Sequence, residues 1–329
     1  MSEKSMKKVV VLGTGGTIAG LAVDRSDNIG YSAAQVSVGA LVSGLTGVDR
    51  LMAGCELVCE QVAQVDSKDM SFGVWRDLLL RCQVYLAKPD VLGVVITHGT
   101  DTLEETAFFL DRLIPDALTG VKPVVLTCAM RPASALCPDG PQNLLDALSV
   151  ALSPEARGVV VVCAGTVHSA RRVQKVHPYR LDAFDSGDEG PLGFVEEGKL
   201  RKVGNWPLAP DCVERVAIEK IANMVQLPRV EIVLNHAGSQ GLVVDALLRD
   251  LGSQPDPLRG IVVAATGNGT LSMALELALL RAQSAGIAVI RATRCPYGQV
   301  VEAADSPFPG SRGLSAVKAR IDLMLALAA

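Results

Sequence analysis

Residues 8–20 read KVVVLGTGGTIAG, an apolar run from Val9 to Leu12 followed by a glycine-rich turn that carries two threonine hydroxyls. Similar short β-branched runs recur along the chain, and helix-length segments with a period near 3.6 residues lie between them. Strands that are apolar along their length and joined by helical crossovers form parallel sheets covered on both faces. The sequence therefore predicts an α/β protein.

The expected elements alternate along most of the chain. Strands are expected at Lys8–Leu12, Leu57–Val65, Val91–Thr97, Pro123–Cys128, Gly158–Cys163, Val230–Leu234, Gly260–Ala264 and Ile287–Ile290. Helices are expected at Ala33–Leu45, Lys68–Ala87, Thr102–Leu113, Gln142–Leu152, Gln240–Leu251, Thr270–Ala285 and Leu314–Leu327.

The length of 329 residues is about twice that of a typical single domain. The rhythm breaks between Asp182 and Pro228, where four prolines and Gly-Pro and Asn-Trp-Pro sequences favour hairpins and a connector. We expect a larger N-terminal parallel-sheet domain at residues 1–206, a linker at 207–228 and a smaller C-terminal α/β domain at 229–329.

Composition excludes several classes of partner. The chain has 31 basic and 35 acidic residues, and no basic block is interleaved with aromatic residues, which argues against nucleic acid and anionic membranes. No apolar run approaches the roughly 18 to 20 residues that cross a bilayer. The N-terminal run Val9–Leu12 is too short for a secretion signal, so a cytoplasmic protein with a small-molecule ligand is expected.

The eight cysteines are expected to be mostly small buried thiols in a reducing compartment. The four histidines never fall at helical i, i+3 or i, i+4 spacing, and Cys55 and Cys59 do not have the spacing of a zinc knuckle. Neither a metal nor an organic cofactor is expected.

Candidate site residues follow the strands, because ligands of open parallel sheets bind outside the carboxyl ends. Thr17 lies in the first turn, Ser67 follows the second strand, Thr100 and Asp101 follow the third, and Lys175 lies further along. A threonine hydroxyl is a weak nucleophile, so it needs a proton acceptor such as a lysine held by a carboxylate, and glycine N–H groups can stabilise an oxyanion.

Plainer interpretations exist for each feature taken singly. Thr100 or Asp101 could cap the next helix, with Glu104 closing a capping box, and Ser67 could cap the helix that follows it. The glycine-rich turn could cradle phosphate. However, the dinucleotide fingerprint needs a glycine where Ile18 stands, and the P-loop needs Lys-Ser/Thr at positions 21 and 22.

The segments TGGTIAG at 14–20 and HGTDTLEETAFFL at 98–110 resemble the two signature segments of bacterial-type L-asparaginases and glutaminase-asparaginases. The resemblance extends in order through AMRP at 129–132, DGPQNL at 139–144, GPLG at 190–193 and GNG at 267–269, so it covers nearly the whole chain. It implies an amidohydrolase that converts L-asparagine to L-aspartate and ammonia.

The resemblance also implies roles for individual residues. Thr17 matches the primary nucleophile, and Tyr31 matches a tyrosine of a mobile lid that hydrogen-bonds it; the polar stretch Gly20–Tyr31 is expected to be that lid. Thr100, Asp101 and Lys175 match the second set of hydroxyl, acid and lysine. The assignment of Thr17 as the threonine that attacks first rests on the resemblance alone.

For substrate binding, Ser67 matches the serine that holds the α-carboxylate, and Asp101 would also meet the α-amino group. Glu302 matches an acid supplied by a neighbouring subunit, in a homotetramer built from two close dimers. Lys68 stands where glutamine is frequent, and Thr270 stands where asparagine is frequent. Lys68 is therefore placed among the substrate-binding residues, and the ratio of asparagine to glutamine hydrolysis stays open.

Three alternatives remain at this point. The chain could be a glutaminase-asparaginase, an amidase-like domain of a tRNA-dependent amidotransferase, or a module that binds asparagine or aspartate without turnover. The apolar positions Leu314, Val317, Ile321 and Leu325 of the last helix suggest a subunit contact, although packing on their own domain is equally consistent with the pattern.

Overall fold

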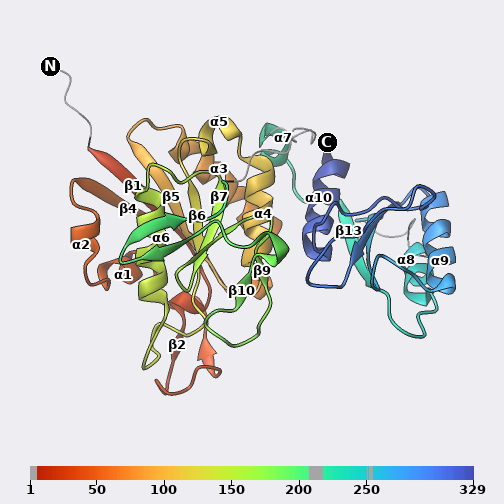
Figure 1. Ribbon diagram of the computed structural model, residues 1–329, viewed down its shortest axis with the longest axis horizontal. Helices are drawn as coiled ribbons and strands as arrows, with labels where there is room; N and C mark the ends of the chain where they lie inside the picture. The colour runs from red at the N-terminus through yellow and green to blue at the C-terminus, as the bar shows by residue number, and fades with distance from the viewer. Residues whose placement is uncertain (1–5, 207–217, 250, 252–254) are drawn as a thin grey trace. The chain divides into compact units, whose positions relative to one another are not determined.

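The computed structural model describes residues 6–206, 218–249, 251 and 255–329. The chain divides into two compact units, Met1–Glu214 and Arg215–Ala329 (Figure 1). The first holds an eight-stranded sheet and the second a three-stranded parallel sheet, each with helices. The predicted fold class, with a larger N-terminal and a smaller C-terminal α/β domain, is confirmed.

The large sheet has the strand order β12-β11-β8-β7-β6-β5-β1-β4. Its strands are β1 (Lys7–Gly15), β4 (Cys55–Val65), β5 (Val91–Thr97), β6 (Val124–Thr127), β7 (Val159–Cys163), β8 (Thr166–Ser169), β11 (Gly193–Glu196) and β12 (Lys199–Lys202). The five neighbouring strands β4, β1, β5, β6 and β7 are parallel, as predicted. The other three are antiparallel, because β8 turns straight back from β7 and β11 and β12 form a hairpin.

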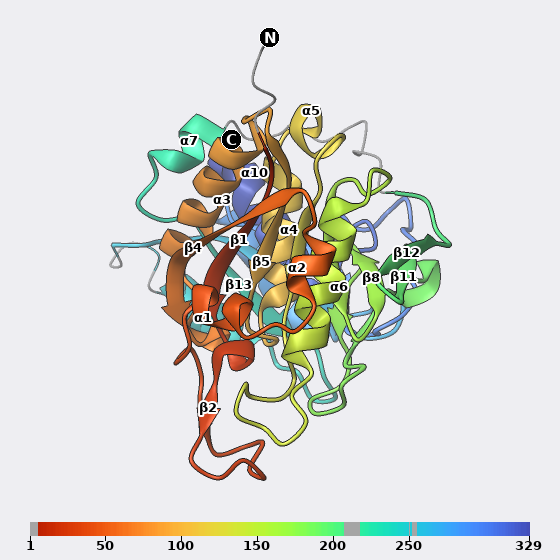
Figure 2. The ribbon, with the colours of Figure 1, turned by 90° about the vertical axis from the view of Figure 1, so that its left-hand side faces the viewer.

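Helices cover both faces of this sheet (Figure 2). On one face, α1 (Val38–Ser43), α2 (Val48–Leu51) and α6 (Gly140–Leu152) pack over alternate strand residues that include Val9 and Val11. The intervening residues face α3 (Phe72–Leu86) and α4 (Leu103–Leu113), which contact β5 and β7, and the short α5 (Asp116–Thr119) follows α4. The central strands are therefore buried on both faces.

Short elements at the carboxyl ends of the strands carry the candidate residues. They are η1 (Thr17–Ala19), β2 (Leu21–Ala22), β3 (Tyr31–Ser32), η2 (Ser67–Asp69), β9 (Gln174–Lys175), β10 (Phe184–Asp185) and η3 (Gly187–Glu189). Two helix starts were predicted too early. The hydroxyls of Ser37 and Ser71 accept hydrogen bonds from Ala40 N and Val74 N, so α1 and α3 begin just after these capping serines.

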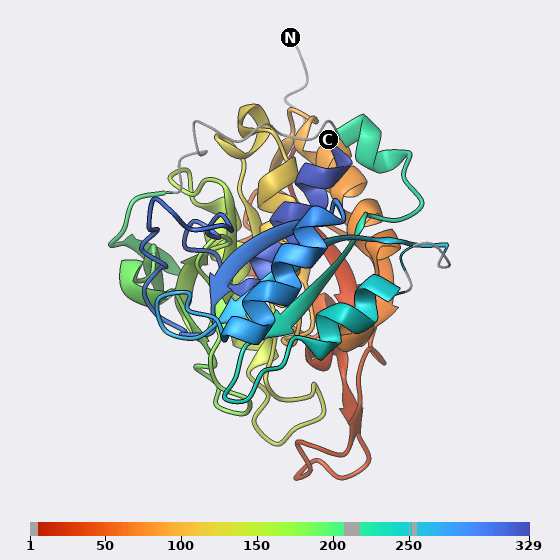
Figure 3. The same ribbon diagram turned by 90° about the vertical axis from the view of Figure 1, so that its right-hand side faces the viewer.

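The second unit has β13 (Arg229–Leu234), β14 (Leu258–Ala265) and β15 (Ala288–Thr293) in one parallel sheet. Helices α8 (Leu242–Arg249) and α9 (Met273–Ser284) pack on one face, and α10 (Ala316–Ala328) packs on the other (Figure 3). Alternate residues of β14 separate the faces: Ile261 lies in the α8–α9 core, whereas Gly260 lies under Leu323 of α10.

The last helix, α10, packs on β13, β14 and β15 of its own unit. Ile321 and Leu325 are fully or almost fully buried, and Leu314 just before the helix is also buried. The helix therefore has packing partners within its unit, and the expected subunit contact stays a prediction. The predicted linker 207–228 lies outside the described residues as far as position 217, and α7 (Ile218–Ala222) occupies part of the remainder.

The expectation that most cysteines are buried is wrong. Of the seven cysteines in the described part of the chain, Cys82, Cys128 and Cys163 are buried, whereas three are exposed. Cys59 is exposed because it lies on β4, the edge strand of the large sheet. Among the described helices, none has the length and apolar character needed to cross a membrane.

Candidate active site

The first cluster joins the glycine-rich turn to the hairpin that follows it. Gly15 and Gly16 have φ values of 100° and 80°, which non-glycine residues rarely adopt, and they turn the chain so that Thr17 follows the end of β1. The oxygen atoms of Thr17 and Tyr31 lie 2.7 Å apart in a hydrogen bond. Thr17 is 8% exposed, so its hydroxyl is largely shielded from bulk water.

The second cluster joins residues 75 positions apart. Lys175 Nζ donates hydrogen bonds to Thr100 Oγ1 at 2.9 Å and to Asp101 Oδ1 at 2.6 Å. Thr100 Oγ1 also lies 3.4 Å from the same carboxylate oxygen. Lys175 reaches this position because β9 pairs with β10, with Lys175 opposite Phe184. The structure thus brings together the hydroxyl, acid and lysine that the sequence singled out.

A direct backbone contact joins the loops that carry the two clusters. A Cβ atom on Gly16 would lie 2.3 Å from Gly99 Cα, so neither position has room for a side chain there. The hydroxyl of Thr14 donates to the carbonyl of Thr97 at 2.9 Å, which ties the two strand ends together. Thr17 and Thr100 follow the touching glycines directly, so their backbones are held side by side.

The glycine turn does not supply all the donors expected of it. Gly16 N donates to the carbonyl of Val65 at 2.9 Å, so this N–H is already used and cannot bind an oxyanion.

Ser67 also joins the second cluster. Its hydroxyl accepts a hydrogen bond from Asp101 N at 3.2 Å, and its carbonyl accepts one from the Thr102 hydroxyl at 2.7 Å. The capping interpretations are therefore wrong. Thr102 is the N-cap residue of α4 but makes no side-chain capping bond, and Ser71 rather than Ser67 caps α3.

Two other predicted residues are not brought into these clusters by the contacts observed. The ammonium of Lys68 lies 3.1 Å from Asp66 in an ion pair, and Asp66 raises the pKa of Lys68. Glu302 belongs to the second unit, where its carboxylate accepts a hydrogen bond from Gly310 N at 3.1 Å.

A buried chain of hydrogen bonds behind the second cluster was missed from the sequence. Trp75 Nε1 donates to Thr106 Oγ1 at 2.8 Å, and this hydroxyl lies 2.9 Å from His98 Nε2. His98 Nδ1 lies 2.8 Å from the Gly99 carbonyl, so the ring donates from Nδ1 and accepts at Nε2. Burial lowers the pKa of His98 to about 4, which keeps the ring neutral. The only sequence signal was a histidine at the end of an apolar strand.

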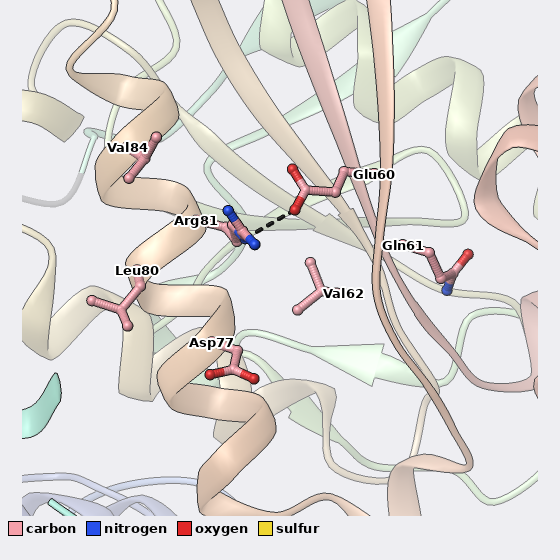
Figure 4. A pocket seen from close by; sticks show the side chains of 7 residues that line it. All are labelled: Glu60, Gln61, Val62, Asp77, Leu80, Arg81 and Val84. Atoms are coloured by element: carbon pink, nitrogen blue, oxygen red, sulfur yellow. Dashed lines mark ion pairs between the residues drawn. The ribbon is translucent and has the colours of Figure 1, made fainter. Parts of the chain in front are cut away.

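One cavity in this unit lies away from the two clusters. It has a volume of about 410 Å³ and lies between β4 and α3, where Arg81 Nε pairs with Glu60 at 2.9 Å (Figure 4). None of the predicted site residues lines it. The candidate active site is therefore identified by the side chains that converge at the strand ends and not by the size of a cavity.

Family models match both units of the chain. Residues 8–207 match the model described as asparaginase, N-terminal, and residues 229–329 match the glutaminase/asparaginase C-terminal domain. The chain belongs to the asparaginase family.

Particular relatives extend this match over almost the full length. L-asparaginase 2 of Escherichia coli is 35% identical over 98% of this chain and 89% of its own. Glutaminase-asparaginase of Acinetobacter glutaminasificans is 35% identical over 97% of this chain and 94% of its own. The solved structure of a probable cytoplasmic L-asparaginase from Campylobacter jejuni has a TM-score of 0.84 and 33% identity, and covers 98% of this chain and 95% of the other.

Proposed function

We propose that this protein hydrolyses the side-chain amide of L-asparagine to give L-aspartate and ammonia. Family membership supports the reaction class, and relatives named L-asparaginase support the substrate. The observation that carries the assignment of residues is the Lys175 ammonium, which bonds both Thr100 and Asp101 beside the Thr17–Tyr31 pair. A hydroxyl with a partner for its proton is the minimum that nucleophilic attack on an amide requires.

In the first half-reaction, Thr17 Oγ1 attacks the amide carbon and loses its proton towards Tyr31 or the Lys175 cluster. The tetrahedral intermediate collapses when the carbon–nitrogen bond breaks and the nitrogen leaves, protonated, as ammonia. The product is a β-aspartyl ester on Thr17. The 2.7 Å contact supports this route, because a proton acceptor must lie within hydrogen-bond reach of the nucleophile.

In the second half-reaction, a water near Thr100 attacks the ester carbonyl. A proton of this water passes through Thr100 Oγ1 to the departing oxygen of Thr17, while the Lys175 ammonium holds Thr100 by its hydrogen bond, so the enzyme returns to its starting state. Asp101 holds the lysine in place through the 2.6 Å ion pair. Thr17 thus forms the acyl-enzyme, and the second cluster resolves it.

Substrate recognition follows from the charges around the second cluster. The α-carboxylate of asparagine is bound by Ser67, with the Lys68 ammonium next to it in sequence. The α-ammonium is bound by Asp101, and Glu302 of a neighbouring subunit completes this side in a homotetramer built from two close dimers. In this arrangement residues 1–206 carry the catalytic threonines, and residues 229–329 complete a neighbouring subunit's site.

A cytoplasmic location is part of the proposal. It is supported by the solved structure from Campylobacter jejuni, whose description names a cytoplasmic protein.

A glutaminase-asparaginase is the second candidate. Relatives with that name match this chain at 33% and 35% identity, as strongly as those named L-asparaginase. The two candidates differ only in tolerance of one extra methylene, which is worth about 1–3 kcal/mol of discrimination in a pocket. We therefore expect asparagine to be preferred, with weaker glutamine hydrolysis.

The test is ammonia release from L-asparagine and from L-glutamine by the purified protein, with calorimetric titration of asparagine and ATP. Release from asparagine supports the proposal. Binding of asparagine without ammonia release would instead show a binding module, and a higher specificity constant for glutamine would favour the second candidate.

A further inference from the structure

The lid, residues 20–31, connects Thr17 to Tyr31 and extends away from the sheet (Figure 2). Its two ends pair as a short antiparallel ladder in which Ala22 lies opposite Tyr31. Its tip is held by local bonds: Asp24 accepts from Ser26 N and Oγ, and Asp27 accepts from the N–H groups of Ile29 and Gly30. These bonds shape the tip, but they do not fix the position of the lid on the unit.

The loop after β6, residues 128–139, lies beside the lid and has firm supports of its own (Figure 1). The two carboxylate oxygens of Asp139 accept from Met130 N and Arg131 N, each at 2.9 Å. The Arg131 guanidinium donates to the Cys137 carbonyl at 3.0 Å. These internal hydrogen bonds fix the conformation of the loop, so the lid can be held in place by contacts with it.

Three hydrogen bonds join the lid to this loop. Ala22 N donates to Ser134 Oγ at 2.7 Å, Arg25 Nε donates to the Ser134 carbonyl at 3.1 Å, and Leu136 N donates to the Arg25 carbonyl at 3.1 Å. The shortest bond acts on Ala22, the residue paired with Tyr31.

We propose that Ser134 is a positioning residue that latches the lid through Ala22 and so holds the Tyr31 hydroxyl against Thr17. Arg25 secures the same latch from the lid side through its side chain and its carbonyl. The inference rests on the proposed function, because it assigns Ser134 an effect on the same reaction through Tyr31.

The kinetic test compares two serine-to-alanine substitutions. Ser134→Ala removes the acceptor for Ala22 N, and we expect kcat/KM for asparagine to fall about tenfold, the effect of one ordinary hydrogen bond. Ser134→Thr keeps a hydroxyl and should restore most of the rate. Ser26→Ala is the matched control, since its hydroxyl donates to Asp24 within the lid tip, and it should change the rate less than about twofold.

The Tyr31→Phe background distinguishes positioning from a general structural effect. If Ser134 acts through the tyrosine hydroxyl, Ser134→Ala should lower the rate of Tyr31→Phe by less than about twofold. An unchanged tenfold loss in that background would overturn the proposal.

Hydrogen exchange supplies a readout that is independent of turnover. Amides of residues 23–31 should exchange faster in Ser134→Ala than in the parent or in Ser26→Ala, whereas those of β5 should not change. Faster lid exchange in a protein that releases no ammonia would support the latch while refuting the proposed function. Unchanged lid exchange with unchanged turnover in Ser134→Ala would overturn the latch alone.

Discussion

Lys175 Nζ lies 2.9 Å from Thr100 Oγ1, although the two residues are 75 positions apart in the sequence. Thr100 follows β5, and Lys175 lies on β9, which is outside the large sheet. The same Lys175 ammonium lies 2.6 Å from Asp101 Oδ1 in an ion pair. The convergence of these three side chains is the geometry on which the proposed second half-reaction depends.

Lys175→Met should lower kcat for asparagine by about 10³-fold or more, because a catalytic unit fails when one member is lost. The melting temperature should hardly move, since the Asp101 side chain is 55% exposed and an ion pair of this kind is worth at most about 1 kcal/mol. Lys202→Met on the exposed hairpin strand β12 is the control and should retain full activity. A Lys175→Met enzyme within tenfold of the parent would remove this residue from the mechanism.

Gly16→Ala should destabilise the fold by at least about 3 kcal/mol, because its Cβ would overlap the Gly99 backbone in addition to the strain of a positive φ. Gly54→Ala is the matched control: φ is 83° there, but a Cβ would meet no atom within 4 Å. It should cost only about 1–2 kcal/mol. Urea unfolding of both variants measures the difference, and equal losses would show that the two loops do not touch as described.

His98 should make stability fall as the pH falls. The folded pKa of about 4 lies below the ordinary 6.5, so the unfolded chain binds the proton first, and the contribution present above pH 6.5 is lost as the pH approaches 4. The loss between pH 7 and pH 5 should be about 2 kcal/mol. Urea unfolding of the parent and of His98→Gln at both pH values measures how much of this loss of stability comes from His98. An equally steep dependence in His98→Gln would contradict the assignment.

Lys68→Gln should improve the affinity for asparagine. Asp66 and, more weakly, Asp101 raise the pKa of Lys68, so its ammonium lies near the carboxylate that is proposed to bind the substrate α-ammonium. A like-charge contact between the two ammonium groups there costs on the order of 1 kcal/mol. The ion pair with Asp66 already offsets part of the positive charge of Lys68. We therefore expect KM to fall only severalfold. Specificity constants for asparagine and glutamine, measured side by side, check this. A rise in KM would show that Lys68 instead binds the α-carboxylate.

The sequence predicted the parallel strands of the large sheet well, because each is a short β-branched run that is apolar along its length, with helix-length segments between the runs. It did not predict β9 and β10, since strands of two residues carry too little pattern to be recognised, and it did not predict β8, which turns straight back from β7 without a helix between them. Helix starts at Ser37 and Ser71 were also missed, because a capping serine looks like any other polar residue until its backbone partner is known.

The same limit applies to the site. Thr17, Thr100 and Asp101 lie in conspicuous motifs at strand ends, so they could be singled out. The hydrogen bonds of His98 and Ser134 could not be predicted, because their partners lie 8 and 112 positions away along the chain, and only the folded backbone brings them together.

The most direct test of the central claim is the rate of ammonia release from L-asparagine by the parent and by Thr17→Ala, with unfolding measured on both. We expect the parent to release ammonia and Thr17→Ala to be slower by about 10³-fold or more at nearly unchanged stability. Turnover by Thr17→Ala within about tenfold of the parent would contradict the assignment of Thr17 as the nucleophile.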